Sequence, residues 1–219
     1  MSAAPVTTVT HFMRPTTAWL VAIACAAVPG MAGAQAPVAV PLSSPIAASS
    51  LPVAPSAAVR PPPPGWLAAR LPGADLRGQG RLRFFGLDIY DALLWTAPGF
   101  EPASFERHAL ALQLVYRRGL VGEQIAERSL KEMRALPGFD ASRAEAWLAR
   151  MKTLFPDVSA NDQLVGLYQP GVGVGFWLNG QPRGDVADPL FARLFMGIWL
   201  SPQTSEPNLR QALLGLAAP

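Results

Sequence analysis

The sequence predicts an α+β fold, an open-faced sandwich in which helices cover one face of a large antiparallel sheet. Three observations indicate this class. The expected elements follow the order strands, two helices, strands and two helices, which favours a sheet with its helices gathered on one side. Residues 109–116 alternate in polarity, as a half-buried strand does. Asn179-Gly180 follows an alternating apolar segment as a two-residue hairpin turn, since both residues tolerate positive φ.

The expected strands are apolar segments rich in β-branched and aromatic residues. They cover residues 81–96, 109–116, 163–168 and 172–178. An irregularity is expected near Gly86, because glycine inside a strand marks a bulge or bend. The apolar face of the second strand consists of Leu110, Leu112, Leu114 and Tyr116.

The expected helices show apolar residues at helical spacing. They cover residues 125–136, 141–155, a segment that begins at Asp188-Pro189, and 207–214. Asp140 or Ser142 can cap the second helix, and Asp188 the third, where a proline follows in the first turn. Gly215 is expected to end the last helix as its C-terminal cap.

The N-terminal segment is predicted to be a cleavable signal peptide over residues 1–34. Arg14 precedes an apolar run over residues 18–28, and Ala32-Gly33-Ala34 has the small residues of a peptidase site. A membrane anchor is the alternative, but a spanning helix needs roughly 20 apolar residues. Cys25 lies inside the apolar run, and lipidation there is a second alternative. Cleavage of the signal peptide would place the protein in the periplasm or outside the cell, where it could associate with the envelope.

Residues 35–64 are rich in Pro and Ala and are predicted to be a disordered linker, followed by one domain over residues 65–219. This domain contains no cysteine and a single histidine, His108. Disulfides, thiolate sites and multi-histidine metal sites are thereby excluded. No metal and no cofactor are predicted, and no pattern indicates an oligomeric state. The net charge of +3 comes without a basic stripe, so no nucleic-acid partner is expected.

Two groups of side chains are candidates for a binding site. Arg81 and Arg83 share one face of their strand with Phe85, if the strand is regular. They could bind an anion, or they could form structural ion pairs with Asp88 and Asp91. The three tyrosines, Tyr90, Tyr116 and Tyr168, lie on predicted strands and could share one cleft; alternatively each is a core residue whose hydroxyl is bound to backbone.

The glycines of residues 171–175 do not form a dinucleotide-binding loop. Such a loop follows a strand and opens a helix, whereas these glycines lead into a strand and a hairpin turn. Close packing of another group over this strand is the preferred explanation.

The domain as a whole resembles the chalcone isomerase-like family, in its exported bacterial branch. The resemblance rests on the order and spacing of several short segments. They are 80–95 (GRLRFFGLDIYDALLW), 155–158 (FPDV), 168–171 (YQPG), 178–180 (LNG), 198–202 (IWLSP) and 209–215 (LRQALLG). The family implies the same open-faced sandwich, with a ligand cleft between sheet and helices.

The resemblance carries two expectations about function. Plant members cyclise chalcones with the help of a threonine and a tyrosine; the corresponding positions here are Phe85 and the segment 120–122, which reads Leu-Val-Gly. Other relatives bind fatty acids through an arginine and a tyrosine, and Arg118 falls near the position of that arginine. We therefore expect a small apolar, fatty-acid-like anionic ligand to be bound without catalysis. The expected head-group contacts are Arg83, Tyr90, Tyr116 and Arg118.

Two alternatives to simple binding stay open. The first is an isomerase or intramolecular lyase of the chalcone isomerase type, in which a tyrosine gives acid–base help; no catalytic residue is assigned. The second is a tethered structural module whose cleft is filled by its own side chains.

Overall fold

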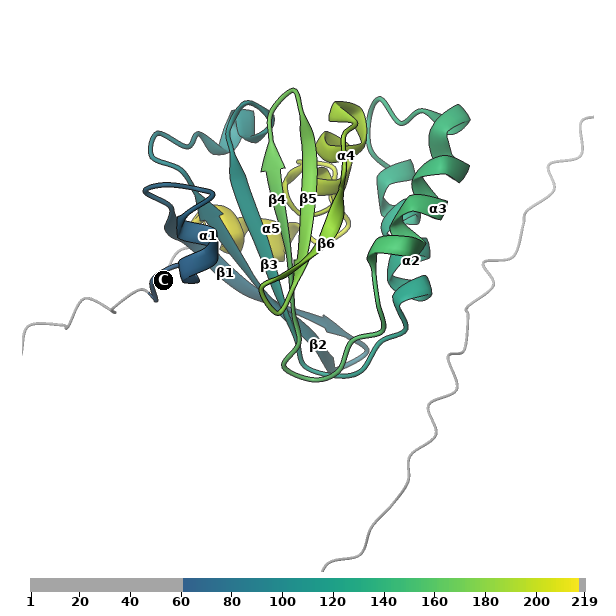
Figure 1. The fold of residues 1–219 in the computed structure, drawn as a ribbon, viewed down its shortest axis with the longest axis horizontal. Helices are drawn as coiled ribbons and strands as arrows, with labels where there is room; N and C mark the ends of the chain where they lie inside the picture. Colours follow the sequence, from purple (N-terminus) through teal and green to yellow (C-terminus); the bar gives the residue numbers. More distant parts are fainter. Residues whose placement is uncertain (1–60, 217–219) are drawn as a thin grey trace, which may run out of the picture. The chain divides into compact units, whose positions relative to one another are not determined.

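A computed structural model describes residues 61–216 of the chain (Figure 1). Its strands are β1 (Asp75–Phe84), β2 (Leu87–Thr96), β3 (Leu110–Tyr116), β4 (Gln163–Gln169), β5 (Gly173–Leu178) and β6 (Gln181–Val186). Its α-helices are α1 (Gly65–Ala68), α2 (Gly122–Arg134), α3 (Ala144–Leu154), α4 (Pro189–Leu200) and α5 (Pro207–Leu214). Short 3-10 helices cover Pro102–Arg107 and Ala141–Arg143.

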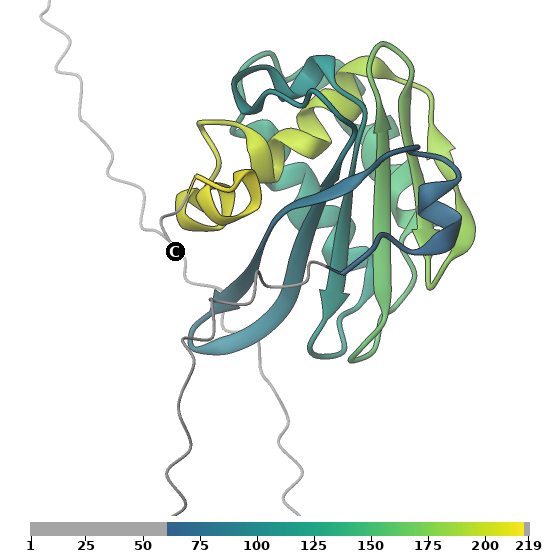
Figure 2. The same cartoon turned by 90° about the vertical axis from the view of Figure 1, so that its left-hand side faces the viewer.

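The six strands of the described part form one sheet in the order β1-β2-β3-β4-β5-β6, and each neighbouring pair is antiparallel. Helices α2 to α5 lie on one face of this sheet, as the two perpendicular cartoon views show (Figures 1 and 2). The structure therefore confirms the predicted α+β open-faced sandwich.

The alternation along β3 explains how the sheet supports two apolar layers. Leu110, Leu112, Leu114 and Tyr116 are buried in the main core, against the helices. Ala111, on the opposite face, joins a smaller cluster with Leu67 of α1. Because side chains of a strand point to alternate faces, one short segment contributes to both layers.

The predicted strand over residues 81–96 is in fact a hairpin. The chain turns at Phe85 and Gly86, whose φ angles are 48° and 77°, and Phe84 pairs with Leu87 across the turn. The expected irregularity near Gly86 is this turn itself. The first strand begins at Asp75, well before the predicted boundary, and neither α1 nor β6 was expected as an element of its own.

The local signals for turns and caps are confirmed. Asn179 and Gly180 both have positive φ and join β5 to β6. The Asp188 carboxylate accepts hydrogen bonds from the backbone N–H groups of Leu190 and Phe191 at the start of α4. Gly215 ends α5 in the left-handed conformation, with φ of 64°.

The close packing expected over the glycines of β5 is also present. A Cβ on Gly173 would lie 2.2 Å from the carbonyl oxygen of Val186, and one on Gly175 would lie 2.7 Å from the ring of Trp177. The neighbouring strand and an indole ring therefore occupy the space that larger side chains would need.

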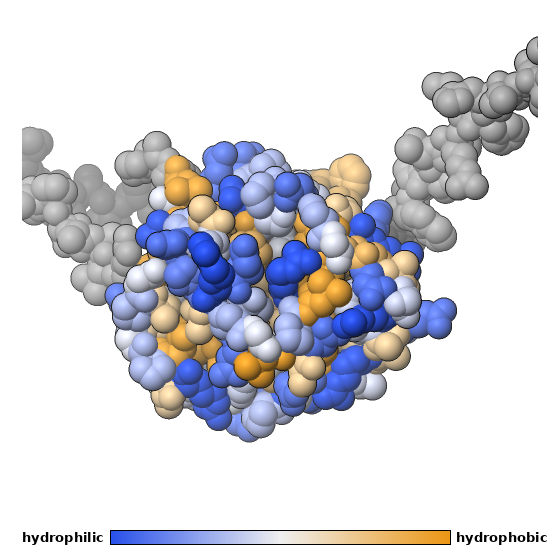
Figure 3. All heavy atoms as spheres, turned by 90° about the horizontal axis from the view of Figure 1, so that it is seen from above, coloured by the Kyte–Doolittle hydropathy of each residue, from blue (hydrophilic) through white to orange (hydrophobic). Residues whose placement is uncertain are grey.

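The predicted signal peptide and residues 35–60 of the predicted linker lie outside the described residues. Among residues 61–216, no helix has the length and apolar character needed to cross a bilayer. The face seen in Figure 3 carries small hydrophobic groups interspersed with hydrophilic ones.

Candidate functional site

A cavity of about 330 Å³ lies between the sheet and its helical layer. Side chains from β1 to β4 form its floor, and α2, α4 and the segment before α5 form its walls. Most of the lining is apolar: Leu82, Phe84, Ile89, Leu114, Leu120, Ile125, Phe155, Leu164, Phe195 and Ile198. The volume falls at the lower end of the range for small-molecule pockets, which span about 300–1,000 Å³.

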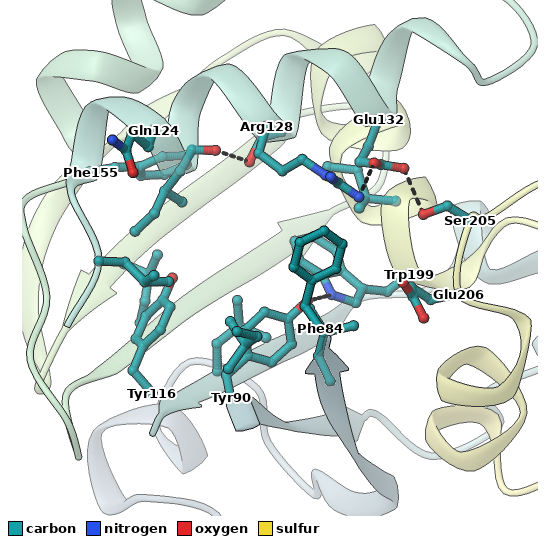
Figure 4. Close-up of a pocket in the computed structure, with 18 of the residues that line it drawn as sticks. Phe84, Tyr90, Tyr116, Gln124, Arg128, Glu132, Phe155, Trp199, Ser205 and Glu206 are labelled. Atoms are coloured by element: carbon teal, nitrogen blue, oxygen red, sulfur yellow. Dashed lines mark hydrogen bonds and ion pairs between the residues drawn. The ribbon is translucent and has the colours of Figure 1, made fainter. Parts of the chain in front are cut away.

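Two tyrosines line the floor of this cavity (Figure 4). Tyr90 of β2 and Tyr116 of β3 are direct partners in the antiparallel register. Their ring centroids lie 6.0 Å apart, with the planes at 83°. Cross-strand neighbours come within this distance whenever the register pairs them, so β2 and β3 place both phenols at one site.

The two phenolic hydroxyls differ in their partners. The Tyr90 hydroxyl accepts a hydrogen bond of 2.9 Å from the indole N–H of Trp199 on α4. Among residues 61–216, no hydrogen-bond partner is found for the Tyr116 hydroxyl, although this residue is only 1% exposed. Burial raises the pKa of both tyrosines above the usual value. Both phenols are therefore protonated at neutral pH and can donate a hydrogen bond to a ligand.

The polar groups of the opposite wall come mainly from α2. Arg128 forms an ion pair of 2.7 Å with Glu132 one turn later, and the Ser205 hydroxyl donates a 2.8 Å hydrogen bond to the same carboxylate. Figure 4 shows this chain of contacts above Phe84 and Trp199. Because the carboxylate has two partners, it joins α2 to the segment before α5 and leaves the arginine neutralised.

The position of α2 over the cavity depends on a glycine at its first residue. A Cβ on Gly122 would lie 2.1 Å from the carbonyl oxygen of Phe155, so only glycine permits this close approach. The Gly122 N–H donates a 2.9 Å hydrogen bond to the Asp157 carboxylate. These contacts fix the start of the helix that carries Arg128.

The structure brings two of the four predicted contacts to the cavity. Tyr90 and Tyr116 line it, whereas Arg83 and Arg118 are not among its lining residues. Leu82 and Phe84 face the cavity, and Arg83 between them forms an ion pair with Asp88. The helix-covered face of β1 is thus the Leu82 face, and not the arginine face as expected.

The arginines of β1 form the predicted alternative, an ion-pair network. Arg81 pairs with both Asp88 and Asp91, and Arg117 of the next strand pairs with Asp91. The hydrogen bond from Arg81 is the main cause that holds the pKa of Asp91 below its usual range. These arginine and aspartate side chains form ion pairs with one another on the face of the sheet away from the helices.

The third tyrosine does not share the cavity. The Tyr168 hydroxyl donates a 2.8 Å hydrogen bond to the carbonyl oxygen of Glu106, which is the predicted alternative of a core phenol bound to backbone. Trp199, which was not among the predicted contacts, contributes an N–H to the site. Arg128 and Glu132 were not recognised, because an i,i+4 pair of opposite charges is also the ordinary pattern of an exposed helix face.

Within residues 61–216, no group of three or more His, Cys, Asp or Glu side chains is arranged to hold a metal ion. The polar groups that line the cavity are its two phenols, the indole N–H of Trp199 and the polar and charged side chains of its wall.

Comparisons with known proteins agree with this arrangement. A protein of Haemophilus influenzae, known only as an uncharacterized protein, is 34% identical over 106 residues, which are 48% of this chain and 52% of its own. The chain thus spans about half the length of this relative. The crystal structure of an Arabidopsis thaliana fatty-acid binding protein matches with a TM-score of 0.53 at 16% identity, over 65% of this chain and 87% of that one.

The family assignment follows from the sequence and the fold together. The profile of the chalcone isomerase-like family matches residues 74–215, from just before β1 to the end of α5. The structural match at low identity shows that the fold is shared. This chain therefore belongs to the chalcone isomerase-like family.

Proposed function

We propose that the protein binds a small apolar, fatty-acid-like ligand in this cavity without transforming it, and that it does so after export, in the exported bacterial branch of its family. The observation that carries the proposal is the unpartnered Tyr116 hydroxyl at the floor of an apolar cavity. This hydroxyl is open to the cavity rather than enclosed by protein, and a polar group in an apolar pocket normally has a hydrogen-bond partner. A ligand acceptor is the partner that would satisfy this one.

The polar groups indicate which end of the ligand is recognised. At the wall, Arg128 is neutralised by Glu132, so it offers little net attraction for an anion. At the floor, Tyr116 and Tyr90 stay protonated, because burial raises the pKa of both phenols. Each hydroxyl can therefore donate a hydrogen bond to an oxygen of a carboxyl group. A hydrogen bond to a charged oxygen contributes about 1.5–3 kcal/mol. We therefore place the carboxyl head group at the tyrosines and the hydrocarbon tail along the apolar lining.

The name of the Arabidopsis neighbour, a fatty-acid binding protein, supports the same ligand class. Burial of the tail supplies most of the affinity, at about 25 cal/mol per Å² of apolar surface removed from water. The head-group contact orients the ligand and distinguishes acids from plain hydrocarbons.

Two measurements test this proposal. Native mass spectrometry of the protein isolated from its own host, followed by solvent extraction, should reveal a co-purifying fatty acid. Displacement of a fluorescent polyene fatty acid should then give the affinities of a fatty acid and of its methyl ester, with the acid binding more tightly.

The control uses two substitutions to the same residue. Ile125→Trp places an indole inside the cavity and should abolish binding, whereas Val172→Trp alters a residue that does not line it. The proposal fails if the wild-type protein binds no fatty acid, or if Ile125→Trp binds as well as Val172→Trp. Equal affinity for acid and ester would contradict the head-group assignment alone.

A further inference from the structure

The turn between β1 and β2 presents large apolar side chains to solvent. Phe85 is 89% exposed, Phe84 51% and Leu87 42%. Figure 2 shows this hairpin bending away from the other strands, so that its turn stands apart from their ends. The two phenyl rings contact each other, edge to face, with centroids 4.5 Å apart. We call these three residues the hairpin tip.

The backbone of the hairpin tip is strained by its residue type, although a turn of this geometry can be built without strain. Phe85 and Gly86 have φ angles of 48° and 77°, and Asn179 and Gly180 of the β5–β6 hairpin have 50° and 80°. The two turns thus share one geometry. Asn is favoured at the first position, whereas a bulky residue with positive φ is strained. A phenylalanine that is strained and 89% exposed gains little from the fold beyond its contact with Phe84, which points to an external contact.

Arginines surround the hairpin tip. Arg81 and Arg83 precede it on β1, and Arg117 and Arg118 follow β3 at the same end of the sheet. Asp88 and Asp91 lie beside these four, and with Asp157 and Asp162 further along this end of the sheet the formal charges balance.

Two of these arginines have nitrogen atoms available. Arg83 uses only its Nε in the bond to Asp88. For the Arg118 side chain, no hydrogen bond or ion pair is found within residues 61–216. The next carboxylates at this end, Asp157 and Asp162, accept hydrogen bonds from the backbone N–H groups of Gly122 and Ser159.

We propose that the hairpin tip inserts into the interfacial region of an anionic phospholipid bilayer, with the surrounding arginines on the lipid phosphates. Aromatic and aliphatic side chains insert at this depth, and basic residues are attracted to an anionic surface. A stable protein interface buries about 800 Å² on each partner, which three side chains on a protruding turn do not supply. A weak, reversible contact with a membrane needs far less surface.

The contact with the bilayer goes beyond ligand binding and does not depend on it. Phe84 belongs both to the hairpin tip and to the cavity lining, so docking would bring this side of the cavity close to the lipid surface. Phe85 and Leu87 do not line the cavity. They can therefore be changed without altering the ligand site.

The test compares the full chain with two variants on vesicles of phosphatidylethanolamine and phosphatidylglycerol. Phe85→Asn should lower the vesicle partition coefficient at least about 10-fold, which corresponds to about 1.4 kcal/mol. The same change relieves the turn and should raise the melting temperature. Val172→Asn removes an apolar residue that is 58% exposed at the opposite end of the sheet, and it should leave partitioning unchanged. Added salt should weaken binding of the parent protein.

A second measurement reports on the hairpin tip even if another segment also holds the chain on the vesicle. Phe85→Trp should add fluorescence that brominated lipids quench, whereas the added fluorescence of Val172→Trp should resist quenching. Equal partitioning of Phe85→Asn and Val172→Asn, or equal quenching of the two tryptophans, would overturn the inference. Polyene fatty acid displacement by Phe85→Asn measures the ligand site separately, so the two proposals can fail independently.

Discussion

Replacing Tyr116 with phenylalanine removes a single oxygen atom, and its consequences follow from where that oxygen lies. The hydroxyl has no hydrogen-bond partner in the described part of the chain and is open to the cavity rather than enclosed by protein, so its loss breaks no internal hydrogen bond. The free energy of unfolding should change by less than about 0.5 kcal/mol, or rise, since the mostly apolar lining gives the hydroxyl no partner. Ligand affinity should instead fall, because the head group loses its donor. The expected loss is about 1.5–3 kcal/mol, or roughly 10- to 150-fold.

Tyr90→Phe is the matched control for this prediction. It removes the acceptor of the Trp199 N–H and leaves a buried donor unsatisfied, which costs about 1–3 kcal/mol of stability. Urea unfolding and polyene fatty acid displacement would measure both variants. The reasoning is refuted if Tyr116→Phe is the less stable of the two, or if it binds fatty acid as tightly as the wild-type protein.

Three further outcomes follow from the structure. Gly122→Ala should destabilise the protein by at least about 2 kcal/mol in urea unfolding, since its Cβ would lie 2.1 Å from a backbone oxygen. Asp91→Asn should be less stable than wild type at neutral pH. The hydrogen bond from Arg81 lowers the pKa of the Asp91 carboxyl, so the difference between the two proteins should be present above about pH 4 and shrink as the pH falls further. Glu132→Gln leaves Arg128 without its carboxylate and should raise fatty-acid affinity a few-fold in low salt, with no such gain for the methyl ester.

The features that were predicted correctly are those that depend only on residues close together in the sequence. The turn at Asn179-Gly180 and the cap at Asp188 each depend on the chemistry of adjacent positions, and the structure contains both. The apolar face of β3 depends only on a period of two. Because long-range contacts support rather than override these preferences, local reasoning was sufficient.

Three features could not be predicted because they depend on tertiary placement or contradict local rules. The turn at Phe85-Gly86 places phenylalanine where turn chemistry favours asparagine, so the hairpin was interpreted as one strand. The alternation of side chains along β1 placed Arg83 and Leu82 on opposite faces of the strand. It did not indicate which of these faces the helices cover. Tyr116 and Tyr168 occupy similar strand patterns, yet only Tyr168 lies within reach of a backbone carbonyl.

The carboxylates that line the cavity bear on the alternative of catalysis of the chalcone isomerase type, for which Tyr116 and Tyr90 are the two candidate phenols. Catalysis by acid–base transfer needs a proton acceptor near the donor phenol. Among the lining carboxylates, Glu132 is engaged by Arg128 and Ser205. Glu206 lies beyond Trp199, at the other end of the cavity from Tyr116 (Figure 4).

A reaction that uses both Tyr116 and Glu206 would need a substrate that spans the cavity, whereas binding needs only the hydroxyl. Glu206→Gln should therefore leave fatty-acid affinity within about 2-fold of wild type, as expected for a side chain that does not contact the head group. The same variant should be assayed on enone substrates. Turnover by the wild-type protein that disappears in both Glu206→Gln and Tyr116→Phe would establish catalysis and overturn the proposal of a binding protein.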